Sequence, residues 1–187
     1  MPSILKSIPF KPIQGKDKMT RKYRRHFMKS KETKDLLTKA SEKLKVDLAD
    51  IFGLKANVEL VETSIADFFL IGGKPLLIKT GGILFPVLTF SKLLASMPKV
   101  VVDMGAVPHI CNGADVMAPG IASFKGEFSK GDLILVADER HGKIIAIGEA
   151  IHDVDIAREV VQGIVVKNIH SVGDRLWELT KELAPNP

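Results

Sequence analysis

Apolar positions in the first third of the chain follow a helical period. From Thr33 onward they recur at Leu36, Leu37, Ala40, Leu44 and Leu48, with charged residues between them. This spacing predicts one amphipathic helix with a single apolar face. Gly53, which follows Ile51 and Phe52, is a suitable residue to end it.

The pattern changes to short apolar runs between residues 57 and 97. Four of them predict strands: Val58–Val61, Phe68–Ile71, Pro75–Ile78 and Ile83–Val87. Gly72-Gly73 supplies the positive φ angles that a tight hairpin needs between two of these strands. A short helix is expected around Ser91–Ser96, and Pro98 then indicates a domain boundary.

The elements after Pro98 are short and follow one another closely. Strands are predicted at 100–102, 115–117, 133–137, 143–148 and 164–166, and brief helices at 105–112 and 155–162. The segment 138–142, DERHG, is the strongest hairpin signal in the chain. Many short strands joined by glycine-rich turns are typical of a small barrel.

These patterns predict an α+β protein with an N-terminal mixed α/β domain and a C-terminal β-barrel carrying short helices. The expected divisions are a flexible basic lead (1–19), the α/β domain (20–97), the barrel domain (98–180) and a tail (181–187).

Composition favours a folded protein outside the membrane. The 187 residues are 45% hydrophobic, and no apolar run reaches the roughly 18 residues of a spanning helix. The N-terminus has too many lysines among too few apolar residues for a signal peptide, so a cytoplasmic location is expected. The only cysteine, Cys111, excludes an internal disulfide and a CxxC zinc site.

The net charge of +5 is distributed unevenly. Residues 1–34 hold 11 Lys and Arg against Asp17 and Glu32, while the remainder has 16 basic and 20 acidic residues. A basic arm of this kind suits a polyanion, although a solvated tail that only aids solubility remains open.

A basic run with two aromatic residues follows the lead. Its candidate RNA-contacting residues are Arg21, Lys22, Arg24 and Arg25. If the segment were helical, Arg21, Arg25 and Lys29 would form one cationic stripe. Contact with RNA and packing against the α/β domain are both compatible with that spacing.

Two stretches of the C-terminal half carry a family likeness. Residues 102–107, VDMGAV, followed by 112–121, NGADVMAPGI, resemble the PUA domain of pseudouridine synthases and archaeosine transglycosylases. Residues 143–150 and 163–170 are similar to its last two barrel strands. The likeness covers residues 98–180 in the right order, and it implies a PUA-type barrel that binds RNA without catalysing a reaction.

A narrower likeness extends beyond this domain. Residues 84–88, LFPVL, together with 168–170 and Leu176-Trp177, resemble the translation-associated family first named for a gene amplified in T-cell lymphoma, which includes part of ligatin. The family joins a pre-PUA domain to a PUA domain. The likeness implies work with density-regulated protein on the small ribosomal subunit, on tRNA or ribosomal RNA. The basic lead differs from the animal members and indicates an archaeal relative.

The resemblance also implies where RNA would bind. The expected contact residues are Gly105, Ala106, His109, Asn112, Gly113, Ala114, Met117, Pro119 and Gly120. Gly105 and Gly113 flank the short helix and could bring backbone amides close to a phosphate. In the alternative interpretation the glycines serve turns, and Ala114, Val116 and Met117 serve the core.

Other chemistry has little support in the sequence. Gly72-Gly73-Lys74 and Gly81-Gly82 lack the spacing of phosphate loops, and no HExxH pair occurs among the five histidines. Ser123, His141 and Asp138 could be drawn as a nucleophilic set, but no GxSxG motif accompanies them. We therefore expect no cofactor, no metal and no catalytic residue. The alternatives are an accessory subunit of an RNA-modifying enzyme and a protein-interaction module.

Overall fold

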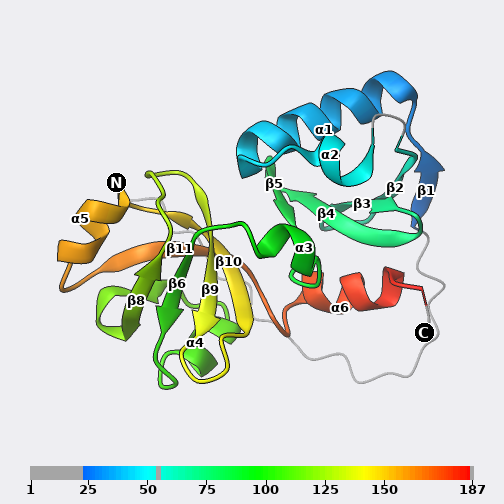
Figure 1. Ribbon diagram of the computed structural model, residues 1–187. Coiled ribbons are helices and arrows are strands. Elements are labelled where there is room, and N and C mark those ends of the chain that lie inside the picture. The colour runs from blue at the N-terminus through cyan, green and yellow to red at the C-terminus, as the bar shows by residue number, and fades with distance from the viewer. Residues whose placement is uncertain (1–22, 54–55, 186–187) are drawn as a thin grey trace, which may run out of the picture.

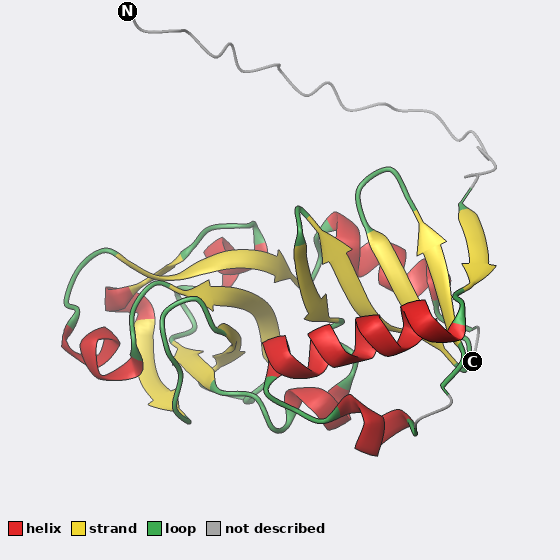
Figure 2. Cartoon of the chain, turned by 90° about the horizontal axis from the view of Figure 1, so that it is seen from above, coloured by secondary structure: helices red, strands yellow, loops and turns green. Residues whose placement is uncertain are grey.

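The N-terminal domain is an antiparallel sheet with helices on both faces (Figure 1). The computed structural model describes residues 23–53 and 56–185. The strand order is β1-β2-β3-β4-β5, with bounds Arg24–Phe27, Val58–Glu62, Asp67–Ile71, Lys74–Thr80 and Ile83–Pro86. Helices α1 (Ser30–Leu44) and α2 (Leu48–Phe52) lie over one face, and α3 (Ser91–Leu94) lies below the other. Figure 2 shows α1 lying over the sheet.

The single helix expected up to Gly53 is two helices. Lys45 has a left-handed φ of 55°, which ends α1, and the Asp47 carboxylate accepts the amide of Ala49 at 2.8 Å as the N-cap of α2. The apolar spacing continues across the break because Leu44 and Leu48 are buried in the same core. Periodicity therefore located the buried face correctly but not the turn within it.

The basic segment is a strand in its described part, so a helical stripe of arginines does not form. Arg24 lies opposite Glu62 on β2, and the Arg25 guanidinium donates to Glu59 on the same strand. Cross-strand pairing of opposite charges stabilises an edge strand, and this outweighs the weak helical signal. Arg21, Lys22 and the lead 1–19 lie outside the described residues.

The C-terminal domain is a strongly curved sheet. Its strand order is β7-β11-β10-β9-β6-β8, and all pairs are antiparallel except β6 with β9. The bounds of β6 to β11 are Lys99–Val102, Val116–Met117, Ile121–Lys125, Leu133–Asp138, Ile144–Ala150 and Ile164–Ser171. The two outer strands, β7 and β8, are joined directly by the 3-10 turn η1 (Ala118–Gly120), so the sheet curls into a barrel. Helices α4 (Val107–Cys111) and α5 (Val154–Glu159) accompany it.

The expected α+β architecture with a C-terminal barrel is confirmed, but strand β8 was not predicted. Ala122 and Ser123 are exposed on it, and Ile121 is only partly buried. An outer strand of this composition gives no apolar run, so sequence periodicity could not detect it.

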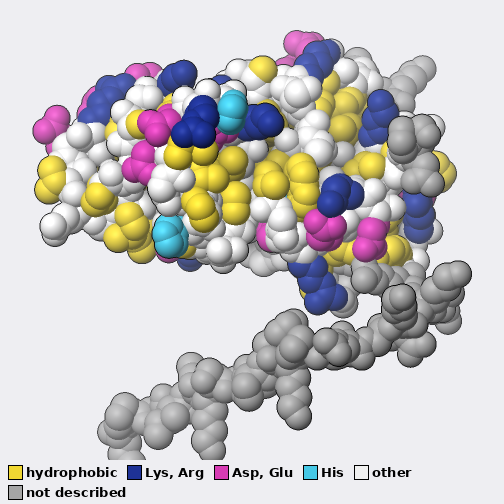
Figure 3. Space-filling model, turned by 90° about the horizontal axis from the view of Figure 1, so that it is seen from below, with side chains coloured by type: hydrophobic (Ala, Val, Ile, Leu, Met, Phe, Trp, Pro, Cys, Tyr) yellow, Lys and Arg dark blue, Asp and Glu magenta, His cyan; other side chains and the backbone are white. Residues whose placement is uncertain are grey.

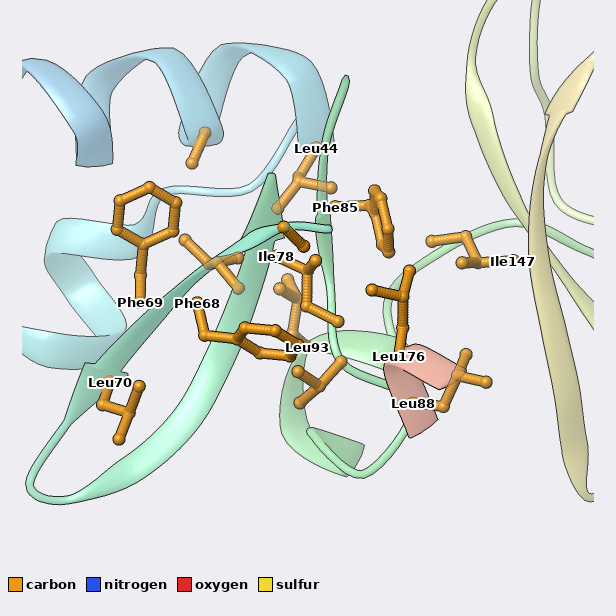
Figure 4. Close-up of a cluster of buried hydrophobic side chains, with 14 of the residues drawn as sticks. Leu44, Phe68, Phe69, Leu70, Ile78, Phe85, Leu88, Leu93, Ile147 and Leu176 are labelled. Carbon is orange, nitrogen blue, oxygen red and sulfur yellow. The ribbon is translucent and has the colours of Figure 1, made fainter. Parts of the chain in front are cut away.

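Strand β9 joins the two domains because both of its faces are buried. Leu133 and Leu135 pack with the N-terminal core, while Ile134 and Val136 point into the barrel. Figure 4 shows the junction, where Ile147 of β10 faces Phe85 of the N-terminal sheet. Burial on both sides explains why this segment is continuously apolar, and it fixes one domain against the other.

Helix α6 (Arg175–Leu183) returns the chain to the N-terminal domain. It extends three residues beyond the boundary expected at residue 180, and Leu179 and Leu183 are buried against the N-terminal sheet. Trp177 is partly buried against the same core. The ring therefore contributes to the packing of α6 on the N-terminal domain.

Asp174 holds the start of α6. Its carboxylate accepts the amides of Trp177 and Ser171, at 2.8 and 3.0 Å, and lies 2.7 Å from Nδ1 of the buried His170. Burial raises the pKa of Asp174, but the hydrogen bond and charge of His170 and the two amides outweigh it, so the pKa lies below its ordinary value of 3.8.

Stability is therefore expected to depend on Asp174 at acid pH. A lowered folded-state pKa means that this contribution is complete above pH 3.8 and is lost as pH falls through the folded-state value. The free energy of unfolding, measured with urea from pH 6 to pH 2, should fall with pH in the unmodified protein. Asp174→Asn should make this fall smaller. An unchanged acid profile in the variant would contradict this role. At pH 6 the variant should cost about 1 kcal/mol, because Asn can still cap the helix but loses the carboxylate contact with His170.

Candidate nucleic-acid interface

The parallel pairing of β6 with β9 brings two loops to the same edge of the barrel. Val102 lies opposite Asp138 at the ends of these strands. The Glu139 amide donates to the Val102 carbonyl at 3.0 Å, and the Met104 amide donates to Glu139 Oε1 at 3.2 Å. Residues 103–120 and the hairpin tip 139–143 therefore form one continuous surface, which we name the α4 face.

Backbone amides at both ends of α4 are paired inside the protein. At the start, the Ala106 amide donates to Asp103 Oδ1 at 2.8 Å. At the end, Gly113 has φ +92° and its amide donates to Ile110, while the Ala114 amide donates to His109. The amides of Ala106, Gly113 and Ala114 are already paired inside the protein, so these three are not available for a phosphate.

Close packing favours glycine at two positions of the motif. A Cβ on Gly105 would lie 3.1 Å from Asp103 Oδ1, and a Cβ on Gly120 would lie 3.0 Å from the Ala106 Cβ. Both approaches are tighter than most real Cβ contacts. The structure thus favours the turn and packing interpretation for these glycines, as it does for Gly113.

The other predicted residues present their side chains to solvent. Val116 is 1% exposed and belongs to the barrel core, whereas its neighbour Met117 is 48% exposed. Exposure is shared by His109, Asn112, Ala114 and Pro119, and Ala106 is partly buried. The α4 face is therefore accessible, and the alternative in which Met117 serves the core is wrong.

Strand β11 holds α4 in place. The side-chain amide of Asn168 donates to the carbonyls of Ile110 and Ala114, at 2.9 and 3.0 Å. The Ser171 hydroxyl donates to the Cys111 carbonyl at 3.3 Å. The Ile110 carbonyl also accepts the Gly113 amide, so these side-chain bonds add to the backbone pairing at the end of α4 and in the turn that follows it.

Removing the Asn168 amide should loosen α4 without unfolding the barrel. Asn168→Ala removes two hydrogen bonds and leaves the Ala114 carbonyl without its donor, a loss of about 1–3 kcal/mol. Hydrogen exchange of the Gly113 and Ala114 amides is expected to accelerate, whereas the amides of β9 should exchange at the original rate. Equal acceleration in both places would contradict a local role.

The acidic and the basic side chains of the α4 face have different roles. The carboxylates of Asp103, Asp115, Asp138 and Glu139 each accept a backbone amide from a neighbouring loop or strand. Arg140 and Lys143 are exposed and form no ion pair with the described residues. The acidic groups thus hold loops in place, while the basic groups are free to meet an anion.

Comparison with known proteins identifies both domains. The PUA domain model matches residues 98–172, and the DUF1947 model matches residues 24–92. A protein of Methanocaldococcus jannaschii is 35% identical, over 82% of this chain and 95% of its own. The chain belongs to this family of two-domain PUA proteins. PUA domains bind RNA, so the α4 face is a surface of an RNA-binding module.

Two further relatives support the assignment over the whole chain. Translation machinery-associated protein 20 of Saccharomyces cerevisiae is 26% identical, over 78% of this chain and 85% of its own. The crystal structure of a hypothetical protein from Pyrococcus horikoshii OT3 is 33% identical with a TM-score of 0.71, over 83% of this chain and 99% of that one. Both domains therefore recur together, and the family has translation-linked members.

Arg140 and Lys143 of the PUA domain were not among the residues predicted from sequence. Figure 3 looks onto the side of the molecule where α4 and the β9–β10 hairpin lie in Figure 1, and basic and histidine side chains gather there beside hydrophobic ones. The hairpin motif was visible in the sequence, but only the pairing of β6 with β9 places its tip beside α4.

The described arginines of the basic segment do not join this surface. Arg24 and Arg25 lie on β1, an outer strand of the pre-PUA sheet, and the hydrogen bond from Arg25 lowers the pKa of Glu59. The Asp138 carboxylate, once considered with Ser123 and His141, accepts the His141 and Lys143 amides of its own hairpin.

Two kinds of feature are absent from the described part of the chain. It holds no cluster of three or more potential metal ligands. None of its helices combines the length and hydropathy needed to cross a bilayer.

Proposed function

We propose that this PUA-domain protein binds structured RNA through the α4 face, without catalysing a reaction, as a translation factor in the cytoplasm. The RNA would be tRNA or small-subunit ribosomal RNA. The observation that carries the proposal is the exposed α4 face, with Arg140 and Lys143 free of acidic partners, on a PUA domain. The translation-associated yeast relative supports the biological setting.

Recognition would rest on shape and on the RNA backbone. Arg140 and Lys143 would contact phosphates, because long basic side chains on a hairpin tip can follow an irregular strand. His109 and Asn112 offer hydrogen-bonding groups suited to a 2′-hydroxyl or a base edge. Met117 and Pro119 supply apolar contact beside them. The paired amides of α4 would stabilise the shape of this surface rather than bind RNA directly.

Binding of a tRNA transcript at several salt concentrations tests the proposal. We expect an affinity that falls steeply with salt, since neutralised phosphates release counterions. We also expect co-sedimentation with small ribosomal subunits. Equal affinity for heparin, with no preference for folded RNA, would contradict it. New modified nucleosides in tRNA incubated with the protein would favour an RNA-modifying enzyme instead.

The family likeness also suggests a protein partner similar to density-regulated protein. Affinity capture in the presence of nuclease tests this part of the proposal separately. Capture of such a partner after RNA digestion would support it. Loss of all partners on digestion would contradict it and leave the RNA-binding proposal unchanged.

A further inference from the structure

A second basic surface lies at the opposite end of strand β10 from the α4 face. It is a cleft of about 440 Å³ between the domains. Its lining comes from α1, the β4–β5 hairpin and β10: Leu36, Lys39, Lys43, Lys79, Gly82, Ile83, Leu84 and Glu149. Three ammonium groups from two elements therefore face one hollow, with a single carboxylate among them. We name it the lysine cleft.

Two of the three lysines of the cleft lack a neutralising partner. Lys39 and Lys79 are exposed and form no ion pair with the described residues. Lys43 donates to the carbonyl of Gly131 in the PUA domain at 2.9 Å, which positions its ammonium group at the domain junction, where its charge also interacts with Asp132. Like charges at i and i+4 on one helix, as in Lys39 and Lys43, destabilise it slightly. An anion in the cleft would remove that repulsion.

The backbone of the β4–β5 turn is not covered by neighbouring atoms. Gly81 and Gly82 form the turn with φ of +56° and +81°, and no atom lies within 4 Å of the position of a Cβ on either one. Gly82 lines the cleft, so an anion could approach its main chain closely. The sequence lacks a phosphate-loop motif here, but the fold brings the glycine turn beside the lysines of α1.

We propose that the lysine cleft binds phosphates of the RNA backbone as a second contact, so that one RNA reaches from the α4 face to the domain junction. This inference rests on the proposed function. The two surfaces are separated by β10, since Ile144 follows the hairpin tip and Glu149 lines the cleft, a separation of roughly 17 Å along the strand. A short hairpin would reach only one surface, whereas a whole tRNA could reach both.

Three double variants and two RNAs test the proposal in the full-length chain. K39A/K79A removes the cleft charges, and R140A/K143A removes those of the α4 face. K31A/K34A is the matched control, because Lys31 and Lys34 are exposed lysines of the same helix outside the cleft. Affinity would be measured for a tRNA transcript and for a hairpin made of its acceptor stem alone.

K39A/K79A should weaken tRNA binding about tenfold and leave hairpin binding unchanged, while K31A/K34A should have little effect on either. If K39A/K79A behaves like the control while R140A/K143A weakens both RNAs, the cleft proposal is wrong and the proposed function stands. If the unmodified protein binds neither RNA, both are wrong. Tighter, Lys39-dependent binding of polyglutamate than of tRNA would show that the cleft takes an acidic protein segment instead.

Discussion

Replacing Gly148 with alanine is expected to destabilise the PUA domain by about 3 kcal/mol, or roughly 10 °C in Tm. Strands β10 and β11 change register here, with Ile147 opposite His170 and Gly148 opposite Asn168, so β11 approaches closely. A Cβ at residue 148 would lie 2.5 Å from the Lys167 carbonyl oxygen. Real Cβ atoms essentially never approach that closely, so the backbone of β11 would have to move.

Gly142→Ala is the matched control, because this glycine lies in the turn that precedes the same strand. It has φ +64° but open space around its α-carbon. Only the backbone strain of about 1 kcal/mol is expected there. Thermal unfolding of both variants checks the difference. Equal losses would mean that β11 can move at little cost, and that the close approach does not fix the strand.

Reversing the charges of Arg140 and Lys143 together should weaken binding to tRNA roughly 100-fold, because two charge-assisted contacts are lost and repulsion replaces them. The slope of log affinity against log salt should fall by about 2 in magnitude. The fold should be unaffected, since both side chains are exposed and form no ion pair with the described residues.

The control for this prediction is K31E/K34E, which changes the net charge equally on α1 of the pre-PUA domain. A loss of affinity confined to R140E/K143E would locate the phosphate contacts on the hairpin tip. Equal losses in both variants would indicate that only net charge matters, and the α4 face would then lose its special role.

Most of the fold could be predicted because buried strands and helix faces give recognisable apolar patterns in the sequence. Strand β9 is buried on both faces and appears as a continuous apolar run, 133–137. The break between α1 and α2 does not interrupt the apolar pattern, because Leu44 and Leu48 continue the helical spacing into the same core. Strand β8 was missed because an outer strand with exposed Ala122 and Ser123 has no apolar pattern.

Only those features of the candidate site that depend on residues close together in the sequence could be predicted. The glycines around α4 indicated the turns, and Gly113 has a positive φ in the turn that follows the helix. Contacts between distant segments were not predictable: Asn168 of β11 pairs with the end of α4, and the tip bearing Arg140 lies beside its start. Pairing of Arg25 with Glu59 likewise depends on the register of β1 with β2.

The central claim is that RNA binds to the α4 face, and amide chemical shifts during titration with a tRNA acceptor-stem hairpin test it most directly. The account predicts the largest changes at His109, Asn112, Met117 and the hairpin tip 139–143, with little change along α5. Changes confined to α5 or to the outer strand β1, with the α4 face unaffected, would contradict it.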